Sequence, residues 1–339
     1  MLSQAMNNLK IHADNLLRRD RYLDRLNARV EHFATKQSSP SRRVIDDARM
    51  SSPVDFEVPE VEAASLTAGI VKRAIRDKGC LIVRNFLNEK EAQQMQSYVD
   101  YSFNLHSKPE DKISQYLLKQ VELAKAVEHT KGDIAKHRET NETYTDTTKI
   151  ARKLGRTLGQ SSSQLTATTP IIIDKILALY DRKGLRNLLN EYFENEPCVS
   201  IYKWVLRKAM SPPVPIDFHQ DGAFMGSGID SLNLWVSLSD CGGDSDSPGM
   251  DFVPVRLKSD FAKGTGSMNW TVAESAVHDV YGEQAVVSPR FNRGDGLFFD
   301  HFLVHRTQHV ADCVRNRYAV ETWFFDSVNF PKNQIPVKW

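Results

Sequence analysis

The order of apolar and polar residues predicts a helical first part of the chain and a strand-rich last part. Near the start, Leu9, Leu16, Leu23 and Val30 recur every seven positions, with charged residues between them. This spacing predicts an amphipathic helix, because such positions share one helix face. The helix could pack on its own domain, or it could join two copies of the chain as a homodimer.

A segment rich in serine and proline follows this helix. Its sequence, TKQSSPSRRVIDDARMSSPVDFEVPEVE, has no apolar periodicity, which is typical of a linker. We therefore expect two parts in the chain. Residues 1–58 hold the helix and the linker, and residues 59–339 form the main domain.

The first half of the main domain predicts helices around one strand. A helical pattern covers EAASLTAGIVKRAIRDKG, the apolar run CLIVRNFL predicts a strand, and Asn88 is a suitable N-cap for a helix in NEKEAQQMQSYVDYSF. Residues from about 107 to 170 are polar and rich in serine and threonine, which favours helices interrupted by surface loops, some able to act as a lid. PIIIDKILALYDRKGLRNLLNEYF then predicts one more amphipathic helix.

The last part of the chain is rich in short, aromatic runs broken by Gly, Pro, Asp and Ser. These runs are CVSIYKWVLRK, SLNLWVSLSD, GMDFVPV, GDGLFFDHFLVH and RYAVETWFFD. Alternating short strands of this kind predict an antiparallel barrel or jelly roll behind the helices, within an α+β fold.

Composition excludes several classes of function. The 44 lysines and arginines nearly cancel the 43 aspartates and glutamates, which argues against a protein that grips nucleic acid through its phosphates. The four cysteines are scattered without a CxxC pair, which favours reduced thiols in a cytoplasmic protein. The sequence contains no apolar run long enough for a signal peptide or a membrane span, so we expect no membrane partner.

The stretch FHQD holds the first candidate for chemistry. His219 and Asp221 are two positions apart, so on a strand their side chains would point to the same face. They could be two legs of a metal site, or an ordinary polar turn. A metal site needs a further ligand, and His301, His305 and His309 all offer one; their spacing alone does not choose among them.

Two histidines and one carboxylate are the ligands of non-haem iron(II) oxygenases, and they leave three coordination positions open. A 2-oxoacid can fill two of these positions and O2 the third. The far carboxylate of such a co-substrate suits an arginine, whose planar fork donates two hydrogen bonds. Arg315 and Arg317 both follow the histidine cluster.

Several ordered segments resemble the phytanoyl-CoA dioxygenase superfamily of iron(II)/2-oxoglutarate-dependent oxygenases. They are FHQDG, LNLWVSLSDC, SPGMDFVPVRLKS, RGDGLFFDHFLVHRTQ and RNRYAVETWF, with a weaker echo in CLIVRNFLNEKEA. The resemblance implies a double-stranded β-helix, also called a jelly-roll or cupin-like barrel, flanked by helices and preceded by the N-terminal helical extension.

The same resemblance implies the roles of individual residues. His219, Asp221 and His305 match the ligands of Fe(II), and Arg317 matches the residue that binds the far carboxylate of 2-oxoglutarate. Thr307 and Trp235 match further positions of the co-substrate pocket. The contact from the earlier strand stays open between Tyr202 and Lys203, and VPVRLKS departs from the usual pattern of the family without touching a ligand.

The resemblance implies a dioxygenase that acts on a small molecule. Because Asp221 is present where halogenases of this type carry a small residue, we expect hydroxylation, or a variant such as desaturation or ring closure. The alternative is a non-catalytic binding or scaffold protein on the same fold. The sequence does not name the substrate.

Overall fold

The computed structural model describes residues 55–107, 164–166, 170–209, 216–226, 228–310, 313–331 and 336–339, with residues 6, 7, 9–11, 13, 14 and 17 near the start. The helices are α2 (Ala68–Lys78), α3 (Glu89–Ser107), α7 (Pro170–Arg182), α8 (Leu185–Phe193), α9 (Gly222–Met225) and α10 (Glu274–Tyr281), with 3-10 turns at Ala63–Ser65 and Glu283–Ala285. Within these described ranges, no helix is long and apolar enough to cross a bilayer.

Three sheets form among the described residues, and they do not close into a barrel there. The large sheet runs β1-β2-β11-β6-β13-β4-β14, with β3 also paired to β4. Its strands are β1 (Glu60–Glu62), β2 (Cys80–Arg84), β3 (Gln164–Thr166), β4 (Pro197–Ala209), β6 (Ser231–Ser237), β11 (Gly296–Phe299), β13 (Arg317–Asp326) and β14 (Pro336–Lys338). The small sheet runs β8-β12-β5-β9. Its strands are β5 (Phe218–His219), β8 (Met250–Phe252), β9 (Thr271–Val272) and β12 (His305–Thr307), while β7 (Cys241–Gly242) pairs with β10 (Arg290–Phe291).

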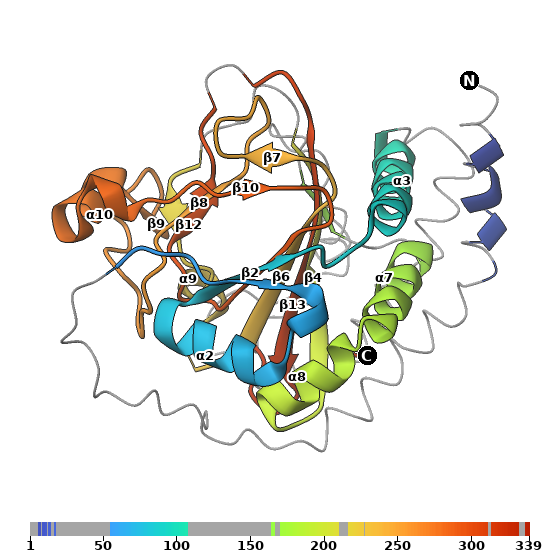
Figure 1. Cartoon of the computed structure of the whole chain (residues 1–339), viewed down its shortest axis with the longest axis horizontal. Coiled ribbons are helices and arrows are strands. Elements are labelled where there is room, and N and C mark those ends of the chain that lie inside the picture. The colour runs from blue at the N-terminus through green and yellow to red at the C-terminus, as the bar shows by residue number, and fades with distance from the viewer. Residues whose placement is uncertain are drawn as a thin grey trace, which may run out of the picture.

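The large sheet is covered on both faces. Helices α3 and α7 lie on one side of it, and the small sheet lies on the other (Figure 1). Strand β6 shows the consequence, because all seven of its residues are buried. Leu232, Leu234 and Val236 belong to the core under the helices, whereas Trp235 belongs to the core between the sheets. Alternate residues of one strand thus serve two cores.

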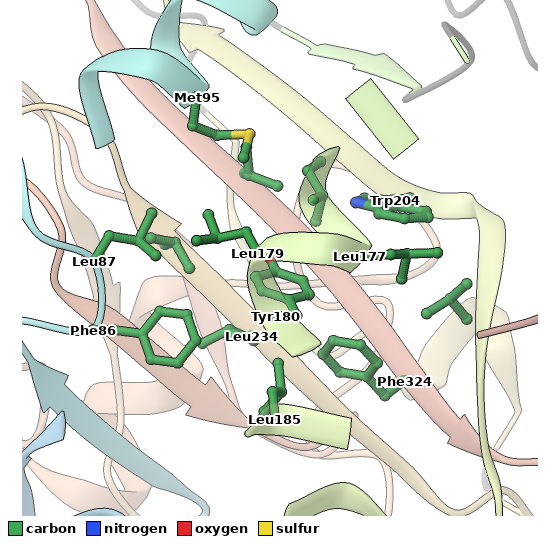
Figure 2. Packing of buried hydrophobic residues seen from close by; sticks show 14 of the residues in the cluster. Phe86, Leu87, Met95, Leu177, Leu179, Tyr180, Leu185, Trp204, Leu234 and Phe324 are labelled. Atoms are coloured by element: carbon green, nitrogen blue, oxygen red, sulfur yellow. The ribbon is translucent and has the colours of Figure 1, made fainter. Parts of the chain in front are cut away.

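Helix α7 supplies the centre of the core under the helices. Figure 2 shows Leu177, Leu179 and Tyr180 of this helix packed over the large sheet, with Phe324 of β13 beside them. The Tyr180 hydroxyl is hydrogen-bonded to Thr322 Oγ1 at 3.0 Å. This bond matters because a buried hydroxyl without a partner destabilises the fold.

The predicted N-cap at Asn88 is confirmed. The backbone N–H of Glu91 donates to Asn88 Oδ1 at 2.9 Å, and the backbone N–H of Asn88 donates to Glu91 Oε2 at 3.0 Å. These reciprocal bonds form a capping box, which satisfies two N–H groups that have no partner within the helix.

Three predicted elements were wrong in detail. The run GDGLFFDHFLVH, expected as one strand, forms β11 of the large sheet and β12 of the small sheet, with residues 300–304 between them. The single helix expected before the strands is two helices, α7 and α8, because Gly184 adopts the left-handed region at φ 71° and ends the first of them. The polar segment at 107–170 contains strand β3, where helices and loops were expected. Most of that segment lies outside the described residues, so its helices and lid stay predictions, as does the domain boundary near residue 58.

Near the N-terminus, the described residues are helical. Ile11 is buried in the core under the helices, and Asp14 forms an ion pair with Lys175 of α7 at 3.2 Å. These contacts favour packing of the helix on its own domain. Leu9 and Leu17 remain 70% and 83% exposed, which leaves apolar surface on the same helix.

The Gly-Asp pair before β11 anchors the end of β2. At Gly294, which has φ 94°, a Cβ atom would lie 2.1 Å from the carbonyl oxygen of Leu87, so only glycine fits. The buried carboxylate of Asp295 accepts hydrogen bonds from Arg84 Nη1 at 2.7 Å and from the Asn85 N–H at 3.0 Å. The sequence motif around Gly-Asp therefore has a structural role.

Replacing Asp295 with alanine should lower the free energy of unfolding by about 3 kcal/mol, because the substitution leaves Arg84 without its buried partner. Urea unfolding followed by circular dichroism measures the change. Glu60→Gln is the matched control, since Glu60 pairs with the same arginine at the surface and should contribute less than about 1 kcal/mol. Equal losses in both variants would contradict the role given to Asp295.

Candidate metal centre

Strands β5 and β12 bring two histidines together. His219 and His305 are direct partners in the antiparallel pairing, and their ring centroids lie 4.4 Å apart. The other two candidates lie elsewhere: His301 Nδ1 is hydrogen-bonded to Ser231 Oγ at 2.7 Å, and His309 is exposed. The structure therefore pairs His219 with His305, the choice that spacing alone left open.

Backbone carbonyls orient both rings in the same way. His219 Nδ1 lies 3.2 Å from the carbonyl oxygen of Asp217, and His305 Nδ1 lies 3.0 Å from that of Leu303. A carbonyl oxygen only accepts hydrogen bonds, so each Nδ1 carries a proton, and in the neutral ring Nε2 then keeps its lone pair. This is the tautomer in which histidine binds a metal through Nε2.

Asp221 follows the histidine of β5 on a turn, and not on the strand that was expected. Strand β5 ends at His219, and Asp221 is the first residue of the turn into α9, where the Met225 N–H donates to its carbonyl oxygen at 3.0 Å. The side chain is buried. Its Oδ1 accepts a hydrogen bond from Lys203 Nζ at 3.1 Å, while Oδ2 has no partner among the described residues.

The charge states of His219 and Asp221 are those that a metal ion requires. Burial, and then the nearby His305, lowers the pKa of His219 to about 3, so the ring is neutral at pH 7. Burial alone would raise the pKa of Asp221, but Lys203 and the two histidines outweigh it and lower the pKa to about 2. Neutral imidazole and ionised carboxylate are the binding forms of these ligands.

Among the described residues, no three His, Cys, Asp or Glu side chains are already arranged around a common metal position. The cation next to Asp221 is instead the ammonium group of Lys203. The donor set nevertheless fits iron(II), since it combines two imidazole nitrogens with one carboxylate oxygen that lacks a partner.

A buried arginine lies with the other two predicted co-substrate residues. Arg317 Nη1 donates to the carbonyl oxygen of Gly249 at 2.7 Å, and Nη2 donates to Thr307 Oγ1 at 3.5 Å. Its guanidinium carbon lies 5.9 Å from the centre of the Trp235 ring. Burial, and then Arg207, lowers the pKa of Arg317 to about 10, so the group stays charged at pH 7.

Arg317 with Thr307 lies on one side of the histidine pair, and Lys203 with Asp221 lies on the other. Because β5 and β12 are antiparallel, Thr307 on β12 lies level with the start of β5, whereas Asp221 follows the end of β5. Arg317 is hydrogen-bonded at the Thr307 side, and Lys203 at the Asp221 side. The centre therefore has a cation on each side of the two histidines.

Sequence reasoning left the residue from the earlier strand undecided, and the structure places Lys203 beside Asp221. The side chain of Tyr202 lies outside the described residues. Arg207, on the same face of β4 as Lys203, forms a short ion pair with Glu321. The sequence contained a signal for both cations: Lys203 and Arg207 are four positions apart on one predicted strand, so their side chains point to the same face.

Arg315, the other arginine considered for the co-substrate, lies at the surface. It forms an ion pair with Asp246, and the side chains of both residues are exposed. Arg315 precedes β13 and is exposed, whereas Arg317 is the first residue of β13 and is 3% exposed.

No protein-family model matches the sequence, and no curated protein matches it either. The resemblance to the phytanoyl-CoA dioxygenase superfamily therefore stays a prediction. Solved structures that are similar in part include two of the same epimerase. One is the non-heme alpha ketoglutarate dependent epimerase SnoN from nogalamycin biosynthesis, with TM-score 0.44, 12% identity, and coverage of 76% of this chain and 83% of that one.

The other solved structure is SnoN in complex with Fe3+, alpha ketoglutarate and nogalamycin RO. Its TM-score is 0.46 and its identity 16%, over 78% of this chain and 87% of that one. At TM-scores below 0.5, these likenesses decide neither the fold nor the function of this chain.

Proposed function

We propose that this protein is an Fe(II)- and 2-oxoglutarate-dependent dioxygenase that hydroxylates a C–H bond of a small molecule, with release of succinate and CO2. In this proposal the large and small sheets are the two halves of a double-stranded β-helix. The ligands are His219, Asp221 and His305, and the co-substrate is bound by Arg317, Thr307 and Trp235.

One observation carries the proposal: of the eleven buried side-chain polar atoms that lack a hydrogen-bond partner among the described residues, five belong to this region. Among the described residues, Asp221 Oδ2, Trp235 Nε1, Arg317 Nε and both amide atoms of Asn233 have no hydrogen-bond partner. Each such atom costs roughly 1–3 kcal/mol when buried, so a fold rarely keeps several in one region. A bound metal ion and a bound dicarboxylate would satisfy them.

The residues of the chain have distinct tasks in this mechanism. The Nε2 atoms of His219 and His305 and the carboxylate of Asp221 would hold iron(II) on one side and leave the other side open. When bound, iron(II) supplies the oxidising centre, using O2 and the electrons released as 2-oxoglutarate loses CO2.

Arg317 would bind the far carboxylate of 2-oxoglutarate through its guanidinium fork. Thr307 Oγ1, which already accepts a hydrogen bond from Arg317, would add a hydroxyl donor to the same carboxylate. The Trp235 ring forms a wall of this pocket. Phe299 and Trp323, both buried between the sheets, keep water from the centre, which strengthens the charged interactions inside it.

Anaerobic titration of the purified protein with Fe(II), with and without 2-oxoglutarate, tests this function. We expect one iron site whose affinity or absorption changes when 2-oxoglutarate is added, followed by succinate release when O2 enters. Absence of Fe(II) binding under both conditions would favour the alternative, a non-catalytic binding or scaffold protein on the same fold.

Three further proposals concern the setting of the protein. A cytoplasmic location agrees with the four scattered cysteines, and the absence of nucleic-acid and membrane partners agrees with the balanced charge and the lack of a long apolar run. A homodimer through the N-terminal helix would cover Leu9 and Leu17, which are exposed in the single chain. An unchanged native mass after deletion of residues 1–35 would contradict the homodimer.

A further inference from the structure

Lys203 places an ammonium group beside the candidate metal centre. Its side chain is 14% exposed, and Nζ lies 3.1 Å from Asp221 Oδ1. The same Nζ lies 3.9 Å from the centre of the Phe224 ring. A buried lysine needs an anion to offset the loss of its hydration, and here that anion is the carboxylate assigned to the metal.

Charge balance at the loaded centre leaves this lysine without a counter-charge. The two charges of iron(II) would be balanced by Asp221 and by the 1-carboxylate of 2-oxoglutarate. Arg317 would be balanced by the far carboxylate, and Arg207 is already paired with Glu321. Among the described residues at this centre, Lys203 then keeps a positive charge without a counter-charge, so the loaded site favours one further anion.

The position of Lys203 assigns this anion to the substrate side. Lys203 and Arg207 lie on the same strand four residues apart, a separation of about 13 Å along an extended chain. The ion pair of Arg207 with Glu321, the strand partner of Trp235, places Arg207 near the co-substrate end. The histidine pair therefore separates Lys203 from Arg317 and Thr307, the residues that would bind 2-oxoglutarate.

Lys203 lies over the ring of Phe224, which in turn contacts the ring of Trp270. Phe224, on α9, is 37% exposed. The Trp270 ring stands perpendicular to the rings of both Phe224 and His219, at centroid distances of 5.8 Å and 5.5 Å. An exposed aromatic residue next to a buried cation suits a ligand that has an apolar body and one negative charge.

We propose that Lys203 binds the carboxylate of an apolar organic acid, whose body packs on Phe224 and Trp270, as the substrate of this enzyme. This inference rests on the proposed function, because it assumes that metal and 2-oxoglutarate fill the rest of the site. The 1-carboxylate of 2-oxoglutarate has the same chemistry, so the test must separate the two sources.

The test uses the full chain loaded anaerobically with Mn(II) and 2-oxoglutarate, and it compares benzoate with benzamide as probes of equal shape. Calorimetry measures the Kd of each probe in the wild type, Lys203→Met, Lys203→Arg and Phe224→Ala. We expect wild-type protein to bind benzoate about 10-fold more tightly than benzamide, the range of a charge-assisted hydrogen bond. Lys203→Met should lose this preference, and Lys203→Arg should keep it.

Phe224→Ala is the matched control, because it should weaken both probes alike and leave their ratio unchanged. A preference for benzoate that survives in Lys203→Met would overturn the proposal. So would a Kd for 2-oxoglutarate that rises about 10-fold in Lys203→Met, since the lysine would then serve the co-substrate. Failure of wild-type protein to bind Mn(II) and 2-oxoglutarate would instead overturn the proposed function. This binding is measured before either probe is added.

Asn233 carries a second inference, on a separate observation. Its side chain is fully buried, and neither its amide oxygen nor its nitrogen has a partner among the described residues. It lies two residues before Trp235 on β6, hence on the same inner face. Its strand partner Phe299 has its ring 4.9 Å from that of His305.

We infer that the Asn233 amide binds 2-oxoglutarate between the metal end and the Arg317 end, which also rests on the proposed function. Asn233→Leu keeps the volume and removes both unsatisfied atoms. It should therefore raise the melting temperature of the ligand-free protein while raising the Kd for 2-oxoglutarate about 10-fold. If the amide had only a structural role, Asn233→Leu would lower the melting temperature or leave the Kd for 2-oxoglutarate unchanged. Either result would overturn this inference.

Discussion

Asp221→Ala should abolish tight Fe(II) binding and reduce turnover by more than the roughly 10- to 100-fold that loss of an outer-shell partner costs. Among the described residues, Asp221 is the anion that acts on both histidines, and its Oδ2 has no partner there. Neutral imidazoles alone neither balance the charge of the metal nor complete its ligand set. Anaerobic iron titration and succinate release measure the two effects separately.

The control for this variant separates loss of the metal ligand from loss of stability caused by an unpaired lysine. Asp221→Ala leaves the ammonium of Lys203 without its hydrogen-bonded partner, which by itself destabilises the protein. The double variant Asp221→Ala with Lys203→Met removes both charges, so it should recover stability without recovering iron binding. Full turnover in either variant would exclude Asp221 as a metal ligand.

Arg317→Met should raise the Kd for 2-oxoglutarate by at least about 30-fold, the factor that corresponds to about 2 kcal/mol for a buried charge pair that loses one partner. The guanidinium is buried, and its Nε has no hydrogen-bond partner among the described residues. Arg317→Lys should lose less, because the charge remains while the planar fork is lost. Calorimetry on the Mn(II)-loaded protein measures both.

Arg315→Met is the matched control, because it removes an arginine two positions away whose side chain pairs with Asp246 at the surface. This variant should bind 2-oxoglutarate like the wild type. If Arg315→Met and Arg317→Met weakened binding equally, the co-substrate would not lie against Arg317. A rise in Km without a matching fall in kcat would locate the loss in binding rather than in chemistry.

Local patterns predicted many of the elements. The capping residues Asn88 and Glu91 determine where α3 begins, since each satisfies a backbone N–H of the other. The alternating residues of β6 showed that a strand was present. They did not show which face met which layer, because every residue of β6 is buried. That assignment depends on the helices packed on one side and the small sheet on the other.

The candidate site follows the same division. The sequence offered three histidines as partners of His219, and only the pairing of β5 with β12 brings His305 to it. The reasoning that His219 and Asp221 share a strand face was wrong, because the strand ends at His219 and a turn presents Asp221. The two residues still approach each other, through backbone geometry that residue spacing does not encode.

The sequence by itself determined α2 and α3, the strands β2, β4, β6, β8 and β13, and the residue types of the candidate centre, because capping, alternation and donor chemistry are local properties. Only the tertiary structure decided that Lys203 lies beside Asp221 and that Arg317 lies with Thr307 and Trp235. The physical reason is that these contacts join strands far apart in the chain. Their proximity is fixed by sheet register and by the packing of the layers, which no short stretch of sequence contains.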